Sequence, residues 1–148
     1  MIELRRMQEG DVLGVMEIEV EVNPSPWSYG IFSDCIKVGY SGFVFEENTE
    51  ILGYGLFSLG VDDAHILILG IKPKHQRQGL GRWMLEHLLA EIKLTGRKSA
   101  YLEVRASNTI AFDLYQKMGF KQIGYRKDYY QIVDGEREDA LVLEYIFE

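Results

Sequence analysis

The sequence has little of several features that point to particular classes of protein. It contains one cysteine, Cys35, in 148 residues. No disulfide can therefore form within the chain, and we expect a reducing, cytoplasmic location. Its apolar runs are far shorter than the roughly 20 residues that span a bilayer, so we expect no membrane partner. No apolar segment follows the charged start, and we expect no signal peptide.

An excess of positive charge is also missing. The chain has 16 Lys and Arg residues against 23 Asp and Glu, a formal net charge of −7. Because nucleic-acid phosphates are held by clustered Lys and Arg, this charge argues against direct nucleic-acid binding. The three histidines, His65, His75 and His87, show no ligand spacing, so we predict no metal site. Acidic residues permit a cationic partner, although most of them serve only solubility.

The composition is that of an ordinary globular protein, 47% hydrophobic and 26% charged, and the length fits a single domain over residues 1–148. Strand-like and helical patterns alternate without repeats or linkers. They predict the order strand, two helices, three strands, helix, strand, helix, two strands, which is a mixed α/β sheet of about seven strands with four helices. The expected strands cover residues 2–6, 38–46, 51–59, 65–71, 99–104, 120–125 and 140–147, and the expected helices begin near 11, 29, 80 and 108.

Several boundaries follow from local chemistry. Asp11 is expected to cap the first helix. Two prolines in residues 23–27 forbid a continuous helix and make that segment a loop. Turns are expected at residues 47–49 and at Asp134–Gly135, each between two strands. Gly96 suits the position just after the third helix.

The most informative segment joins the strand at 66–71 to a helix through the loop Gln76-Arg77-Gln78-Gly79-Leu80-Gly81. The first N–H groups of a helix have no internal partner, and with the helix dipole they form an anion site. Glycines at 79 and 81 let backbone amides approach a phosphate closely. Arg77 and Arg82 can add positive charge.

Two better-known phosphate motifs do not fit this loop. A Walker loop needs Lys and then Ser or Thr after its last glycine, where this chain has Arg82 and Trp83. A dinucleotide fingerprint needs a third glycine where Met84 stands. A bare Gly-x-Gly more often makes only a tight turn. The longer pattern Gln-x-x-Gly-x-Gly, between a strand and an amphipathic helix, is far more specific.

A second group of residues lies around the next strand and helix. Glu103 ends the strand, and Ser107 or Asn108 can cap the helix. Asn108, Ala111, Phe112 and Tyr115 share one face of that helix. A carboxylate and a phenol can therefore meet in one cleft, where the carboxylate can accept a proton and the phenol can donate one. Alternatively, Glu103 is a solvated strand residue and Tyr115 packs in the core.

These motifs resemble those of a known family. Gln76–Gly81 resembles the pyrophosphate-binding motif of the GNAT acetyltransferase superfamily, and the predicted order of elements matches that fold. Residues 101–108, 114–115 and 118–120 are similar to the branch of the superfamily that acetylates the N-terminal alanine of a small-subunit ribosomal protein. Further matches lie at residues 26–28, 129–130, 134–135 and 138–140.

The resemblance implies acetyl-CoA as co-substrate. The pantetheine arm would be bound by backbone amides of Leu69, Gly70 and Ile71, and the pyrophosphate by those of Arg77, Gln78, Gly79, Leu80, Gly81 and Arg82. Asn108 would hold the cofactor, Glu103 would accept a proton and Tyr115 would donate one. Trp27, Tyr129 and Tyr130 would flank the acceptor groove, with Glu136, Glu138 and Asp139 nearby. Gly70 departs from the small Ala or Val expected at its position.

The resulting hypothesis is a monomeric peptide α-N-acetyltransferase whose partner is the N-terminus of a ribosomal protein. A GNAT enzyme that acts on a small amine or a lysine remains an alternative. An acyl-CoA sensor without catalysis is another, although binding alone needs neither Glu103 nor Tyr115. The aromatic and acidic residues near the end of the chain suit a peptide N-terminus with basic residues, or they pair across a hairpin and face solvent.

Overall fold

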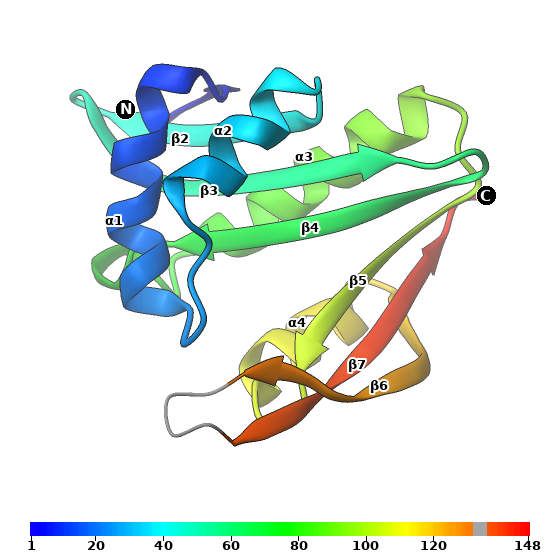
Figure 1. Cartoon of the computed structure of the whole chain (residues 1–148). Coiled ribbons are helices and arrows are strands. Elements are labelled where there is room, and N and C mark those ends of the chain that lie inside the picture. The colour runs from blue at the N-terminus through cyan, green and yellow to red at the C-terminus, as the bar shows by residue number, and fades with distance from the viewer. Residues whose placement is uncertain (132–135) are drawn as a thin grey trace. The chain divides into compact units, whose positions relative to one another are not determined.

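The computed structural model of the chain describes residues 1–131 and 136–148. Seven strands form a mixed sheet in the order β1-β2-β3-β4-β5-β7-β6, with four α-helices (Figure 1). The predicted fold class and element order are confirmed. The chain divides into two compact units, one of Met1–Ser58 with Ile66–Leu88 and one of Leu59–His65 with Leu89–Glu148. That residues 1–148 act as a single domain stays a prediction.

The first unit contains the N-terminal strands and the predicted phosphate loop. Antiparallel pairing joins β1 to β2 and β2 to β3. Asn48 (φ 51°) and Thr49 (φ 67°) make the turn between β2 and β3, and left-handed residues are what a two-residue hairpin turn requires. Its elements are β1 (Glu3–Arg6), η1 (Glu9–Asp11), α1 (Val12–Val22), α2 (Tyr29–Lys37), β2 (Ser41–Glu47), β3 (Glu50–Leu59), the larger part of β4 (Asp63–Ile71), η2 (Pro73–His75) and the first part of α3 (Leu80–Leu94).

Helices cover both faces of β2 and β3. Side chains alternate between the faces of a strand, so each face needs its own cover. On one face, Val44, Tyr54 and Leu56 join a buried cluster with α1 and α2. On the other, the Phe45 ring lies 4.7 Å from the ring of Trp83 on α3. Figure 1 shows α1 and α2 in front of these strands and α3 behind them.

The second unit is built on β5. This strand pairs in parallel with Asp63–His65 at the start of β4 and antiparallel with β7, and β6 lies beyond β7. Alternate residues of β5 are buried: Ala100, Leu102 and Val104. Tyr101, Glu103 and Arg105 therefore share the opposite face. The other elements are β5 (Ser99–Arg105), α4 (Thr109–Lys117), β6 (Lys121–Gln131) and β7 (Arg137–Ile146).

The predicted N-cap residues of α1 and α4 make different contacts. Asp11 occupies the predicted N-cap position of α1, but its side chain makes no capping bond there. Its carboxylate instead accepts two hydrogen bonds of 2.8 Å from the Arg5 guanidinium, a stronger charge-assisted pair. At α4 the cap is Asn108, whose Oδ1 accepts from the Ala111 N–H at 3.2 Å.

Strand ends differ from those expected. β2 begins at Ser41 rather than 38, since Gly39 has a left-handed φ of 89° that interrupts extended chain. β6 runs to Gln131, six residues beyond its predicted end, and pairs there with Arg137. Its charged stretch gave no strand signal in the sequence. The predicted turn at Asp134–Gly135 lies outside the described residues.

Candidate active site

The end of β4 and the start of α3 carry the predicted phosphate loop. The Gln76 side chain donates from Nε2 to the Ile71 carbonyl at 3.0 Å and so ties the loop to the strand. Arg77 (φ 63°) and Gly79 (φ 86°) have left-handed backbone, and α3 begins at Leu80. Backbone amides in such a bend, followed by the free N–H groups of a helix start, form an anion-binding concavity.

The space at Gly79 suits a phosphate group. A Cβ added there would meet no atom within 4 Å, so the loop surface is open at this point. Arg82 is half exposed and lies 3.7 Å from Glu86 on the next turn of α3. Together with the helix dipole, these features fit the pyrophosphate of acetyl-CoA. Which amides of the loop bind it stays a prediction.

Gly70 belongs to the three β4 residues predicted to bind the pantetheine arm, and its identity has a structural cause. A methyl group there would collide with the phenol of Tyr54, which is fully buried. Across Gly70 the Tyr54 hydroxyl donates a 2.7 Å hydrogen bond to the Glu19 carboxyl. Glycine at this position therefore makes room for a buried contact that alanine or valine would block.

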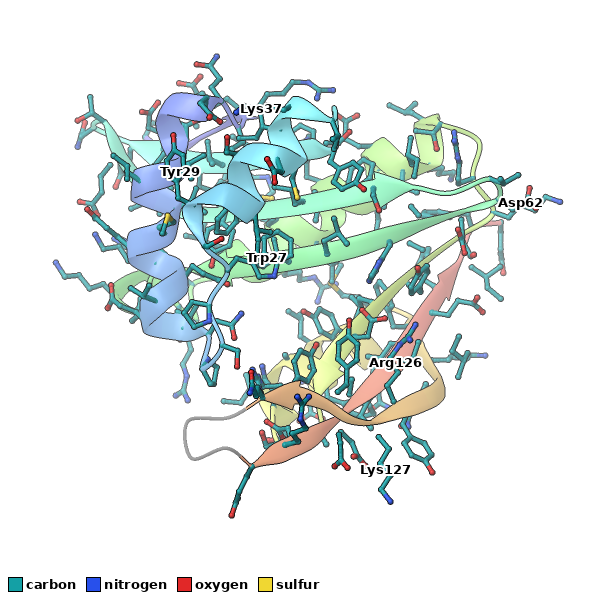
Figure 2. The ribbon with its side chains drawn as sticks, in the orientation of Figure 1. Trp27, Tyr29, Lys37, Asp62, Arg126 and Lys127 are labelled. Atoms are coloured by element: carbon teal, nitrogen blue, oxygen red, sulfur yellow. The ribbon has the colours of Figure 1, made fainter. Side chains whose placement is uncertain are left out.

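Glu19 is a buried anchor for the loop that carries Trp27. Glu19 is only 1% exposed. Its Oε2 accepts hydrogen bonds from the Trp27 N–H and from Asn23 Nδ2, both at 2.9 Å. Both ends of the proline-containing loop are thus held by one carboxyl group. The Trp27 ring packs 5.1 Å from that of Phe32, and Figure 2 shows it beside α2.

Glu103, the predicted proton acceptor, has a side chain only 7% exposed. Its Oε1 lies 2.7 Å from His65 Nε2, and its Oε2 lies 3.5 Å from Arg126 Nε. Burial raises the pKa of Glu103, but the hydrogen bond from His65 and the charge of Arg126 outweigh burial, and the net pKa is lowered. The carboxyl group is therefore ionised at neutral pH.

Tyr115, the predicted proton donor, lies on α4 with its ring 5.7 Å from that of Phe120. Burial raises its pKa to about 12, so the phenol keeps its proton throughout the physiological range. Burial also raises the pKa of Tyr130 on β6, and the nearby Glu103 and Tyr115 raise it further. Glu103 of β5 and Tyr115 of α4 are thus each near enough to Tyr130 of β6 to affect its pKa.

The two predicted acceptor-binding tyrosines are neighbours on β6. Their rings meet edge to face at 5.1 Å, and each carries a cation: Arg105 lies 4.3 Å over Tyr130, and Arg126 lies 5.5 Å over Tyr129. Figure 2 shows Arg126 and Lys127 on opposite sides of the strand, as alternation requires. Tyr130 pairs with Glu138 of β7 across the hairpin, as the alternative interpretation of these residues expected.

Two of the nearby acids are already bonded within the unit. Glu138 accepts from Arg105 at 3.2 Å and from the backbone N–H and hydroxyl of Ser107, both at 3.1 Å. Asp139 accepts from the Asp128 N–H at 2.9 Å. These contacts brace the turn between β5 and α4. They weaken the expectation that both acids attract a basic peptide.

His65, Arg126 and Glu19 were not predicted as parts of the site. The sequence placed His65 in a strand, but it did not reveal that β4 and β5 align His65 with Tyr101, which brings the imidazole to Glu103. Arg126 lay just beyond the predicted end of its strand. Glu19 had a signal, because an acidic residue stood among valines on the apolar face of a helix.

Metal ligands, membrane-spanning helices and a reactive cysteine are three further features that would bear on function. Within residues 1–131 and 136–148, no group of three or more His, Cys, Asp or Glu residues could hold a metal ion. Helices in the described part of the chain all fall short of the length and apolarity needed to cross a membrane. Burial raises the pKa of Cys35, which makes it a poor nucleophile.

The chain is similar to proteins of one known family. The profile of the Acetyltransferase (GNAT) family matches residues 9–120. The [ribosomal protein bS18]-alanine N-acetyltransferase of Escherichia coli (strain K12) is 34% identical over 137 residues, which cover 93% of this chain and 92% of that protein. The Haemophilus influenzae protein of the same name is 32% identical over 140 residues, 95% of each chain. A crystal structure of the E. coli enzyme covers 99% of this chain and 94% of its own, with a TM-score of 0.90 and 33% identity.

Proposed function

The chain belongs to the GNAT acetyltransferase family, an acetyl-CoA-dependent class of enzymes, and we propose that it acetylates the N-terminal alanine of ribosomal protein bS18. The observation that carries the proposal is the grouping of Glu103, Tyr115 and Tyr130 in a chain one-third identical, over nearly its full length, to enzymes named for that reaction. The proposed acceptor is the α-amino group of a peptide, and the proposed location of the enzyme is the cytoplasm.

In the proposed reaction the neutral amine attacks the thioester carbonyl directly. The new C–N bond forms, the C–S bond breaks, and no covalent enzyme intermediate is needed. Glu103, directly or through water, takes the proton that the amine loses. Tyr115 donates a hydrogen bond and then a proton to the departing sulfur as negative charge develops there. Solvent then removes the proton from Glu103 and restores the one on Tyr115, so the enzyme is unchanged.

Binding roles follow the predicted division. The amides of Arg77, Gln78, Gly79, Leu80, Gly81 and Arg82 hold the pyrophosphate, and those of Leu69, Gly70 and Ile71 hold the pantetheine arm. The Asn108 side-chain oxygen caps α4, so its amide nitrogen is the group left for the cofactor. Trp27, Tyr129 and Tyr130 contact the acceptor peptide.

The test is acetyl transfer to a peptide with the N-terminal sequence of bS18. We expect one acetyl group per peptide, located on the α-amino group by fragment mass spectrometry. The matched control is the same peptide with a blocked N-terminus and an internal lysine, which should stay unmodified. Preference for a polyamine or for the lysine would instead identify the small-amine or lysine alternative. Tight acetyl-CoA binding with no turnover on any amine would identify a sensor.

Replacing Gly79 with alanine tests the phosphate loop. The loop holds residue 79 at a left-handed φ of 86°, which costs an L-residue about 1–2 kcal/mol. The added methyl group would also fill the open space in which we propose that the pyrophosphate lies. We expect KM for acetyl-CoA to rise about tenfold, a loss of about 1.4 kcal/mol, with KM for the peptide unchanged.

Gly39→Ala is the control for that substitution. Gly39 has a similar φ of 89° and equally open surroundings, but it lies between α2 and β2, outside the loop. It should lower stability by a similar amount and leave KM for acetyl-CoA at the wild-type value. Equal effects of both substitutions on KM would mean that the loop does not bind the cofactor.

A further inference from the structure

A histidine that no motif assigns a role makes a 2.7 Å contact with the proposed base. His65 lies in β4 and Glu103 in β5, two strands that pair in parallel with His65 opposite Tyr101. The imidazole is stacked on the Tyr101 ring, with centroids 4.3 Å apart and planes 12° apart. The ring is therefore fixed from two sides, by the stack and by the carboxylate.

The contact defines where the protons are. A carboxylate is only an acceptor, and two acceptor atoms do not approach to 2.7 Å without a proton between them. Glu103 is ionised at neutral pH, because its pKa is lowered. The proton must then be on His65 Nε2, which donates to Oε1 of Glu103.

The pKa of Glu103 would be higher without this donor. Burial by itself raises the pKa of a carboxyl group toward the neutral form, and Glu103 is 7% exposed. The other groups that face it are Arg126 and Tyr130 on β6 and Tyr101 on its own strand; its partner on β7 is the apolar Val142. Arg126 is 53% exposed and 3.5 Å away, so solvent weakens its effect.

We propose that His65 is a positioning residue for the acetyl-transfer reaction, whose Nε2–H holds Glu103 in one orientation and keeps its carboxylate ionised for proton uptake. The inference rests on the proposed function for the meaning of the site, but the pairing itself is a property of the resting protein. His65 holds Oε1 at 2.7 Å, whereas Oε2 has the longer contact of 3.5 Å with the half-exposed Arg126, so Oε2 is the oxygen that would take the proton that the amine releases. A base in a fixed orientation needs no rearrangement in the transition state.

Two substitutions test separately the hydrogen-bond donor and the aromatic ring of His65. His65→Phe keeps an aromatic ring that can stack on Tyr101 and removes the donor. His65→Gln loses the stack but keeps an N–H donor of similar reach. We expect kcat to fall about tenfold in His65→Phe, less than the roughly 10²-fold or larger contribution of the base itself because Glu103 is still present, and to recover at least in part in His65→Gln. KM for acetyl-CoA should stay the same in both. Tyr101→Phe, which keeps the stack and the donor, should behave like the wild type.

The second readout does not depend on turnover. The Glu103 side-chain carboxyl can be titrated by carbon NMR in wild type and in both variants. We expect its pKa to rise in His65→Phe, because burial is then opposed only by Arg126, and to stay nearer the wild-type value in His65→Gln. The rate of His65→Phe should accordingly fall more steeply than that of wild type as the pH is lowered from 8 to 6.

The outcomes distinguish this inference from the proposed function. An identical Glu103 titration in wild type and His65→Phe would overturn the pairing, whatever the enzyme acetylates. Equal kcat values for the two proteins would overturn the positioning role of His65 in the reaction. If the bS18 peptide is not acetylated but the Glu103 pKa still rises in His65→Phe, the proposed function fails and the positioning contact stands.

Discussion

Tyr115→Phe and Glu103→Gln are each expected to lower kcat for peptide acetylation by about 10² or more, the usual contribution of a positioned acid or base. Tyr115→Phe removes one oxygen atom and keeps the ring that packs against Phe120. Glu103→Gln keeps the size of the side chain and removes its ability to accept the proton. Steady-state kinetics with both substrates varied should show KM for acetyl-CoA nearly unchanged.

Tyr145→Phe is a close control for the Tyr115 substitution. The Tyr145 ring lies 5.5 Å from the same Phe120 ring, on the strand β7. Loss of its hydroxyl should leave kcat at the wild-type level. If Tyr115→Phe is as active as Tyr145→Phe, Tyr115 is a packing residue and the proton donor is another group. If Glu103→Gln retains full activity at every pH, the amine loses its proton to solvent.

Much of the fold was predictable because its signals are local. The four-residue repeat of Leu80, Met84, Leu88 and Ile92 predicted a helix face, and all four residues are buried. The turn at Asn48–Thr49 was visible between two apolar runs. Boundaries were less predictable where a distant partner decided them. Asp11 stands at the N-cap position of α1 but bonds to Arg5 instead of to the helix, and β6 extends to Gln131, where β7 pairs with it.

The site residues likewise fall into those with local sequence signals and those that depend on distant partners. Glu103, Asn108 and Tyr115 were predictable because strand and helix periodicity relates them within 13 residues. His65 and Glu19 were not, since Glu103 lies 38 residues from His65 and Tyr54 lies 35 residues from Glu19. The first pair meets through the pairing of β4 with β5, and the second through the packing of α1 on β3. Gly70 is the clearest case. It departs from the family pattern because the Tyr54 phenol occupies the space where a side chain at position 70 would lie. This contact is visible only in the structure.

Glu19→Leu is expected to be the most destabilising substitution considered. The leucine has a similar volume but leaves three donors without their acceptor: the Tyr54 hydroxyl, Asn23 Nδ2 and the Trp27 N–H. The Tyr54 hydrogen bond is buried, and those of Asn23 and Trp27 are part-buried. A buried group left unsatisfied costs about 1–3 kcal/mol, and a part-buried group costs less because water can reach it. A total loss of about 3–5 kcal/mol is expected, a large part of the 5–15 kcal/mol typical of a domain, with a fall in Tm of about 10 °C.

Glu19→Gln separates hydrogen bonding from packing. Its amide oxygen can keep the bonds to Asn23 and Trp27, and its nitrogen can donate to the Tyr54 oxygen, so Tm should fall by only a few degrees. Because the lost bonds hold the loop that carries Trp27, folded Glu19→Leu protein at low temperature should also show a raised KM for the peptide and an unchanged KM for acetyl-CoA. Equal Tm values for the Leu and Gln variants would contradict the hydrogen-bonding role. A stable Glu19→Leu protein with normal peptide KM would show that Glu19 does not position the loop.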